Sequence, residues 1–515
     1  MNRCDRMKWE QQIYHQRGES IMPQGVLPYK YEEEKSASGM TALAGLPIYL
    51  DLASVLNLGE SISSHLQVKT QGWTDEQIIL SLILLNLAGG ECVDDLRILE
   101  ADEGFCRILQ RIELKGLQRK TRREKEKQWR KEKHRSVPSS SAVFRYLSAF
   151  HEDYAREEGK AIIPPLTELL RALEMVHTDL VRAIHQRNPI DCATLDMDAT
   201  LIETGKKDAL FSYKGYKAYQ PLNTYWAELG LMLHTEFRDG NVPAGYEQLR
   251  VFMKALSVLP EGVKTVRLRS DTAGYQHDLL KYCDDEQKHP HFGRIEFAIS
   301  CDVTPEFKKA VNETKEWRPL LDKKGRTTGE WAHVCFVPNK SAVTKKTEPY
   351  RYMAIRERMK QPNLPGMDCL PFQTITFEST QYKLFGIVTN MDWEGSKLIS
   401  WHHDRCGKSE EAQSVMKEDL AGGKLPSGDF GENAAWWSIM VLAHNLNTAL
   451  KNLILKDSWV MKRMKAIRFH FITLPGRVME RSRQLFIRIT GDHPSLGLLL
   501  AARQRITRLG HEPSG

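Results

Sequence analysis

Two aspartates, Asp196 and Asp198, interrupt the short apolar segment TLDMDATLI. The alternation of apolar and acidic residues predicts a β-strand that carries both carboxylates on one face. Two like charges on a buried strand cost free energy unless a positive group joins them, and a divalent cation would supply that charge. For either aspartate alone, the alternative is a turn or strand-end position with hydrogen bonds to the backbone.

A third aspartate, Asp271, ends the β-rich run GVKTVRLRSD, and the residues Thr272, Ala273 and Gly274 that follow it open a predicted helix. An aspartate at the carboxyl end of a strand lies where α/β sheets bind their ligands. The alternative is that Asp271 only caps the next helix.

A glutamate, Glu410, is the fourth acidic candidate, in the predicted helical segment 393–420. It is spaced by seven residues from both His403 and Lys417, so the three side chains share one helical stripe. Glu411 is the rival, since it points about 100° away from Glu410 and Lys417 does not lie beneath it. A solvated, charged helix is the alternative for the whole segment.

Strands and helices alternate around these acids. Residues 186–314 predict the first part of an α/β core with right-handed crossovers, and LFGIVTN resumes it in the range 386–430. Between them, residues 315–385 are rich in Trp, Lys, Thr and Pro and predict a β-rich insertion. Residues 1–40 are expected to be poorly structured.

Helical patterns flank this core. Residues 41–185 predict a helical N-terminal domain, in which Thr74 and Asp75 are helix-start candidates and Gly89 marks a stop. Residues 431–515 predict a C-terminal helical region that begins with an apolar helix suited to packing on the core or on a partner subunit.

Positive charge is concentrated in one segment. The chain of 515 residues has a net charge of +7, and residues 115–135 hold eleven Lys or Arg and three Glu, which is +8. The rest is therefore nearly neutral, at 7 − 8 = −1. A nucleic-acid backbone is the polyanion that such a segment fits, and a solvated charged linker is the alternative. The DNA-binding candidates in this segment are Arg119, Lys120, Arg122, Arg123, Arg130 and Lys131.

Several other classes of protein are disfavoured. No apolar run approaches the roughly 18 residues of a membrane span, and the first twenty residues lack the apolar stretch of a secretory signal. The nine cysteines are scattered and form no CxxC pair, so neither a disulfide framework nor a structural zinc site is expected. The sequence predicts a cytoplasmic protein with no membrane partner.

Three segments carry a family resemblance: TLDMDAT, LRSDTAGY and CGKSEEAQSVMK. In this order they resemble the insertion-sequence transposases with a DDE active site, specifically the thirteen-eighty family. The segments LAGGECVDDLRILEAD, FRDGNV, RYMAIRE (as a strand) and LAHNLNTALK also match, so the resemblance covers nearly the whole chain. It implies an α/β, ribonuclease-H-like catalytic core with a β-rich insertion, preceded by an α-helical N-terminal domain.

The resemblance also implies a site. It makes Asp198, Asp271 and Glu410 the catalytic residues and metal ligands, with Asp196 as an additional candidate. Two Mg²⁺ ions, for which Mn²⁺ can substitute, would clamp the scissile phosphate.

The wider superfamily has a Tyr-Arg-Glu-Lys signature around the glutamate, and this chain keeps half of it. Lys417 fits, whereas His403 stands at the tyrosine position and Cys406 at the arginine position, with Arg405 one residue early. Lys417, Arg405 and His403 are thus the implied phosphate contacts.

The implied activity is cleavage of double-stranded DNA at terminal inverted repeats, followed by strand transfer into target DNA by a homodimer in the synaptic complex. Related enzymes flip a base onto an aromatic ring of the insertion, for which Trp317 and Trp331 are candidates, although packed indoles are the alternative. Two other functions stay open: a metal-dependent nuclease of the same fold, and a non-catalytic DNA-binding protein derived from a transposase.

Overall fold

The structure is a computed structural model, and it describes residues 39–131, 134–155, 157, 159–322, 324–338, 350–359 and 372–511. The described residues from Met40 onward belong to one unit, Met40–Gly515. The N-terminal stretch that was predicted to be poorly structured lies almost entirely outside the described residues.

The N-terminal region is helical, as predicted. Its longest early helix, α4 (Asp75–Ala88), begins after Thr74, whose hydroxyl accepts from the Gln77 amide while the Gln77 side chain accepts from the Thr74 amide. It ends at Gly89, whose φ of 102° suits glycine. The other helices are α2 (Ile48–Val55), α3 (Leu58–His65), η1 (Val93–Asp95), α5 (Leu96–Ala101), α6 (Glu103–Glu113), α7 (Arg119–Lys131), α8 (Ser140–Leu147), η2 (Ser148–Phe150) and α9 (Glu168–Arg187).

The helical structure predicted for residues 41–185 is interrupted at residues 151–167. The described residues there have no helical structure, and α9 starts only after its cap Thr167. Pro164 and Pro165 explain the difference, because proline lacks an amide donor and disfavours a helical conformation in the residue before it.

The α/β core predicted from the sequence is confirmed. Five strands lie in the order β7-β6-β2-β8-β9; β2, β8 and β9 are parallel, β6 is antiparallel to β2 and to β7, and β7 therefore runs in the same direction as β2. Helices α10 (Gln248–Val258) and α11 (His277–Asp284) connect the strands as crossovers. The strands are β2 (Cys192–Ala199), β6 (Leu222–Trp226), β7 (Leu231–Glu236), β8 (Thr265–Ser270) and β9 (Glu296–Cys301), and a small separate sheet holds β3 (Ile202–Glu203), β4 (Leu210–Phe211) and β5 (Lys217–Tyr219).

The β-rich segment continues the same sheet. Strand β14 (Thr380–Thr389) pairs with β9 through its last four residues, and through residues 382–389 it pairs with all of β12 (Arg351–Arg358). The domain boundary that the sequence analysis placed after residue 385 therefore falls inside β14. RYMAIRE is a strand, β12, as the resemblance implied. The remaining elements are α12 (Pro305–Glu313), β10 (Arg318–Leu321), β11 (Thr327–Val334) and β13 (Thr374–Phe377).

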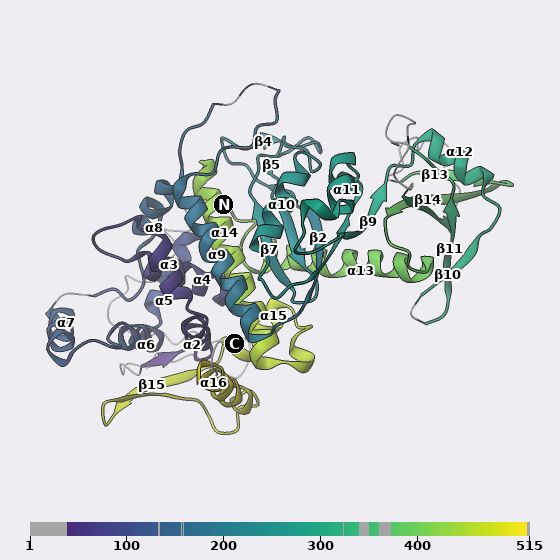
Figure 1. Cartoon of the computed structure of the whole chain (residues 1–515). Helices are drawn as coiled ribbons and strands as arrows, with labels where there is room; N and C mark the ends of the chain where they lie inside the picture. The colour runs from purple at the N-terminus through teal and green to yellow at the C-terminus, as the bar shows by residue number, and fades with distance from the viewer. Residues whose placement is uncertain are drawn as a thin grey trace, which may run out of the picture. The chain divides into compact units, whose positions relative to one another are not determined.

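Two long helices follow the sheet. Helix α13 (Gly395–Ser414) contacts β2, β9 and β11, and so runs from the core strands to the insertion strands (Figure 1). Its last turn widens into a π-helical segment, η5 (Val415–Asp419). Helix α14 (Phe430–Ala449) is buried along nearly its whole length against α4, α9 and β7. The apolar helix that was predicted at the start of the C-terminal region is α14, and it is part of the core.

The prediction that the whole C-terminal region is helical is wrong, because the region also contains a β-hairpin. Strands β15 (Gly476–Arg481) and β16 (Gln484–Arg488) form a hairpin, and β15 also pairs with β1 (Met40–Thr41). The turn residues Ser482 and Arg483 have φ values of 47° and 65°, which match the twist of a tight two-residue hairpin. The other elements are η6 (Leu450–Leu455), η7 (Asp457–Trp459), α15 (Met464–Ile467), η8 (Arg468–Ile472) and α16 (Leu496–His511).

Within the described ranges, no single helix has the length and apolar composition to cross a membrane; α4 passes that test only together with the segment Val93–Ala101, to which it is bent by 92°.

Candidate active site

Two of the predicted acids lie at the carboxyl ends of two adjacent strands. Strands β2 and β8 are parallel neighbours, and Met197 on β2 is in register with Ser270 on β8. Asp198 and Asp271 are the next residues on the two strands. The fold therefore places both carboxylates at the carboxyl edge of the sheet, where α/β proteins bind ligands.

Asp196 has a different environment. It is fully buried, and it is in register with Arg269 of β8. Nε and Nη2 of Arg269 donate to the two carboxylate oxygens at 2.6 and 2.8 Å, and Nη1 donates to the Trp401 carbonyl at 2.5 Å. The positive partner of Asp196 is thus an arginine, and both of its oxygens are engaged.

Helix α13 lies across the ends of β8 and β2. The His402 ring nitrogen Nε2 lies 3.2 Å from the Ser270 carbonyl. Arg405 Nη1 lies 3.7 Å from Asp198 Oδ2, and Gln413 Nε2 donates to the same oxygen at 3.3 Å. Of these three side chains only Arg405 was predicted. His402 and Gln413 lie on the buried stripe of α13, which the many charged residues of the segment conceal in the sequence.

The three predicted ligands are coupled electrostatically at Asp198. The pKa of Asp198 is raised to about 6, mainly by burial and further by the charges of Asp271 and Glu410, while Arg405 and Gln413 oppose the shift. Like charges that disfavour the ionised form of a partly buried acid are typical of functional sites.

The structure separates Glu410 from its rival Glu411. Glu410 acts on Asp198, whereas Glu411 lines a pocket on another side of α13 together with Tyr225 and Lys451. There the charge of Glu411 contributes, after burial and Asp196, to the raised pKa of Tyr225. Both glutamates are exposed, and it is the charge of Glu410 that contributes to the raised pKa of Asp198.

Lys417 also lies near the aspartates. Burial lowers its pKa, and the charges of Glu418 and Asp198 oppose that shift. It belongs to the π-helical segment η5, a distortion that is frequent at functional sites. His403 is exposed on α13, with its ring centroid 5.9 Å from that of His402.

Asp271 caps the helix that follows it, which is one of the two roles that the sequence left open. Its Oδ1 accepts from the Ala273 amide at 3.0 Å, so it caps the short 3₁₀ helix η3 (Thr272–Gly274). This bond uses one carboxylate oxygen. Capping thus fixes the side chain at the sheet edge and is compatible with ligand binding.

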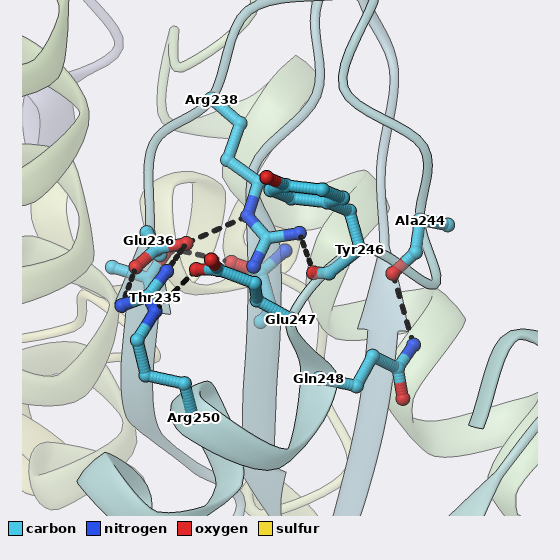
Figure 2. Close-up of polar contacts among 9 residues, drawn as sticks. Thr235, Glu236, Arg238, Ala244, Tyr246, Glu247, Gln248 and Arg250 are labelled. Carbon is cyan, nitrogen blue, oxygen red and sulfur yellow. Dashed lines mark hydrogen bonds and ion pairs between the residues drawn. The ribbon is translucent and has the colours of Figure 1, made fainter. Parts of the chain in front are cut away.

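A buried charge network supports the loop beside Asp271 (Figure 2). Glu236, at the end of β7, binds Arg238 and Arg250 with contacts of 2.7 Å to each. Arg238 Nη1 also donates to the Tyr246 carbonyl at 2.9 Å. Gln276, two residues after η3, donates to the carbonyls of Gly245 and Ala273. The FRDGNV turn is therefore tied to the segment that follows Asp271.

The donor set fits a hard divalent cation, although the side chains do not form a finished cage. Within the described residues, no group of three or more His, Cys, Asp or Glu is arranged to hold a metal ion. Asp198 instead faces Arg405 and Gln413. Three mutually repelling carboxylates nonetheless match the oxygen ligands that Mg²⁺ prefers, and a cation would relieve the repulsion. Binding would require these side chains to turn.

The tryptophans of the insertion are packed. Trp331 is 2% exposed, within the apolar cluster that α13 covers. The indole of Trp317 stacks on Arg356, whose guanidinium lies 4.0 Å from the ring centroid, and Phe377 and Tyr382 enclose the same guanidinium. Trp331 cannot accept a base without unfolding its surroundings, and one face of Trp317 is covered.

The predicted DNA-binding residues of the basic segment lie on α7. Arg119, Arg122 and Arg123 line a groove between α7 and its neighbours, and Lys120 does not. Of Arg130 and Lys131, only the backbone lies within the described residues.

Comparisons with known proteins follow this geometry. A protein-family model described as "Transposase DDE domain group 1" matches residues 34–332 and 374–511, which is most of the chain. Among solved structures, a cryo-EM structure of the piggyBac transposase synaptic complex with hairpin DNA aligns over 92% of this chain and 82% of that chain, with 11% sequence identity and a TM-score of 0.37. No curated protein matches the sequence.

Proposed function

The chain belongs to the Transposase DDE domain group 1 family, and from this premise we propose that it cuts and joins DNA strands in transposition. The family implies a ribonuclease-H-like α/β core, and the structure has a large mixed sheet. The observation that carries the proposal is the meeting of Asp198 and Asp271 at adjacent strand ends, with Glu410 of α13 acting on Asp198.

We assign the catalytic roles to Asp198, Asp271 and Glu410. These carboxylates would hold two Mg²⁺ ions, with Mn²⁺ able to substitute. Bound ions would activate the attacking water or 3′-hydroxyl and stabilise the leaving oxygen at the scissile phosphate. Asp196 is left out of the ligand set, because Arg269 engages both of its oxygens.

The cationic side chains at the site have a separate task. Arg405 balances the charge of Asp198 at 3.7 Å, and Lys417 lies near the same carboxylate. When a DNA phosphate enters, both side chains can bind its oxygens and hold the scissile bond at the sheet edge. The buried His402 ring contacts the Ser270 carbonyl through Nε2, and this contact positions α13 against β8.

The partner is double-stranded DNA, both as the ends of a mobile element and as target. We propose cut-and-paste chemistry: cleavage at terminal inverted repeats, then attack of the freed 3′ ends on target DNA. Synapsis of two ends calls for a homodimer. The motif order supports membership of the thirteen-eighty family of insertion sequences.

A cleavage and strand-transfer assay tests the proposal. The substrate is DNA that carries the element's own ends, with Mg²⁺. We expect Asp198→Ala, Asp271→Ala and Glu410→Ala to keep DNA binding and to lose both cleavage and joining, while Glu411→Ala keeps both reactions. Variants of the three acids that cut as well as the native chain would refute the site. Cleavage that never leads to joining would favour a nuclease, since both reactions use the same ligands.

A change of metal makes the test more specific. Asp198→Cys replaces a hard oxygen ligand with a softer sulfur, so activity with Mg²⁺ should disappear and partly return with Mn²⁺. Asp196→Cys is the matched control on the same strand, and its activity should not depend on the choice of ion. Rescue at neither position would argue against direct contact between Asp198 and the metal.

A further inference from the structure

A groove that none of the proposed catalytic acids line is formed by the N-terminal and C-terminal regions together. It lies between α6, α7 and the β15–β16 hairpin and has a volume of about 920 Å³, which suits a stretch of polymer better than a single ion. Its charged lining residues are Arg107, Arg111, Arg119, Arg122, Arg123, Arg483, Glu126 and Glu480.

The hairpin is fastened to α6 at this groove. Arg107 Nη1 donates to the Val478 carbonyl at 3.4 Å, and Arg111 donates to the Arg483 carbonyl. Arg111 Nη1 also lies 4.0 Å from Glu480 Oε1. These contacts hold the hairpin turn beside the basic helix, although the two are more than 340 residues apart in sequence.

The positive charge of the groove exceeds what its own acids neutralise. Six arginines face two glutamates, which leaves 6 − 2 = +4. Arg122 pairs with Glu126 at 2.9 Å, but within the described part of the chain no ion pair involves the side chains of Arg119, Arg123 or Arg483. On α7, the lining positions 119, 122, 123 and 126 follow the i, i+3, i+4, i+7 spacing of one helix face.

We propose that this groove binds the phosphate backbone of duplex DNA, with α7 on one side and the hairpin turn on the other. The proposal rests on the proposed function and adds the C-terminal hairpin to the DNA-binding surface. Arginine suits this partner, because its planar guanidinium binds two phosphate oxygens at once.

The aromatic side chains of the groove favour a duplex over a single strand. Proteins that bind single strands stack bases on open aromatic rings. The one tryptophan in the lining, Trp129, is stacked on His134, with ring centroids 4.4 Å apart and planes at 14°. This stack covers one face of the indole. The groove therefore presents positive charges to the DNA phosphate backbone. Contacts of this kind carry no sequence information.

Binding of a duplex of roughly 30 base pairs in the absence of divalent metal tests this surface without any chemistry. Arg119→Gln/Arg123→Gln removes two positive charges, Arg483→Gln removes one and the triple variant removes three, all with nearly the same side-chain length. We expect the triple variant to bind at least about 30-fold more weakly at moderate salt, and its salt-dependence slope to fall by about two to three, since each lost phosphate contact lowers it by about 0.9.

Two matched controls make the same charge change but leave the groove contacts in place. Lys127→Gln lies on α7 outside the lining, and Arg488→Gln lies on β16 of the same hairpin, also outside it. Each should change affinity by less than about twofold. Arg483→Lys should restore most of the binding that Arg483→Gln loses, and unchanged thermal unfolding of each variant would show that the hairpin still folds.

Three outcomes would overturn the inference. Normal binding by Arg483→Gln would remove the hairpin from the surface, equal losses in the controls would show diffuse attraction, and tighter binding of a single strand than of the duplex would refute the assigned partner. Failure here is distinguishable from failure of the proposed function. A chain that cuts and joins DNA while its groove variants bind normally refutes only the groove, whereas groove-dependent binding without any cleavage refutes only the enzyme.

Discussion

Asp196 and Asp198 lie two residues apart on β2, and the structure surrounds them in opposite ways. Asp196 is fully buried and receives two hydrogen bonds from Arg269. Asp198 is 17% exposed, meets Arg405 only at 3.7 Å, and shares the sheet edge with Asp271 and Glu410. Asp196 has its counter-charge within hydrogen-bond distance, whereas Asp198 has a more distant guanidinium together with two like charges.

The Glu236 network extends this comparison across the same sheet. Burial alone would raise the pKa of Glu236, yet the hydrogen bond from Arg250 and the charge of Arg238 outweigh it, and the net pKa is lowered. At Asp198 the balance is reversed, and the pKa is raised to about 6. Acids whose guanidinium partners lie within hydrogen-bond distance thus hold the strands and turns together, while Asp198, whose guanidinium partner lies 3.7 Å away, marks the place where we propose that an external cation would be bound.

The largest expected difference concerns the two neighbouring glutamates of α13. Glu410→Gln should lower the rate of DNA cleavage at least about a thousandfold, or about 4 kcal/mol of activation free energy, because it removes a ligand rather than an outer-shell partner worth 10- to 100-fold. Glu411 lines the pocket that also contains Lys451. Glu411→Gln should therefore change the cleavage rate less than about fivefold. Single-turnover cleavage measures both. A comparable loss in Glu411→Gln would break the division between the two sides of the helix.

The second difference is in stability. Arg269→Met should lower the free energy of unfolding by about 3–5 kcal/mol, because it leaves the Asp196 carboxylate buried without a partner. The double variant Asp196→Leu/Arg269→Met should lose less, since no isolated charge remains. Denaturant unfolding of both chains tests this. A double variant less stable than Arg269→Met would mean that packing, and not charge pairing, dominates at this position.

Sequence patterns predicted the strands of the core, because apolar alternation and the residues at strand ends are local features. The strand that ends at Ala199 and the one that ends before Asp271 illustrate this. The register of β2 against β8 is not local, so the sequence could not show that Arg269, rather than a metal, neutralises Asp196. Likewise His402 and Gln413 could not be recognised, because their roles depend on which face of α13 meets the sheet. The hairpin at 476–488 was missed within a region whose helical flanks dominate the pattern.

Substitution of Asp198 at the sheet edge should have a smaller effect on stability, and one of opposite sign, because it should raise the free energy of unfolding. Because the pKa of Asp198 is about 6 in the fold and about 3.9 in an unfolded chain, the folded state binds more protons between these values. The contribution of Asp198 to the free energy of unfolding should therefore fall as pH rises from about 4 to about 6 and stay level above. Asp198→Asn removes this cost, so at pH 8 without metal it should be more stable by about 1–2 kcal/mol, after allowance for its partial exposure.

Thermal unfolding with and without Mg²⁺ provides the control for this variant. A ligand that binds only the folded state stabilises it, so Mg²⁺ should raise the Tm of the native chain and leave that of Asp198→Asn almost unchanged. Asp196→Asn should be less stable than the native chain with or without the ion. A loss of stability in Asp198→Asn would show that the Arg405 contact outweighs the repulsion from Asp271 and Glu410.

The smallest expected effect tests whether the paired region contains redundancy. Arg250 is 48% exposed, whereas Arg238 is 1% exposed, and both bind Glu236. Arg250→Gln should cost less than about 1 kcal/mol of unfolding free energy, because Glu236 keeps Arg238 and water can approach. Arg238→Gln should cost about 2–3 kcal/mol, since the buried guanidinium also donates to the Tyr246 carbonyl. Equal costs measured by denaturant unfolding would mean that the network behaves as one unit, in which exposure does not rank its members.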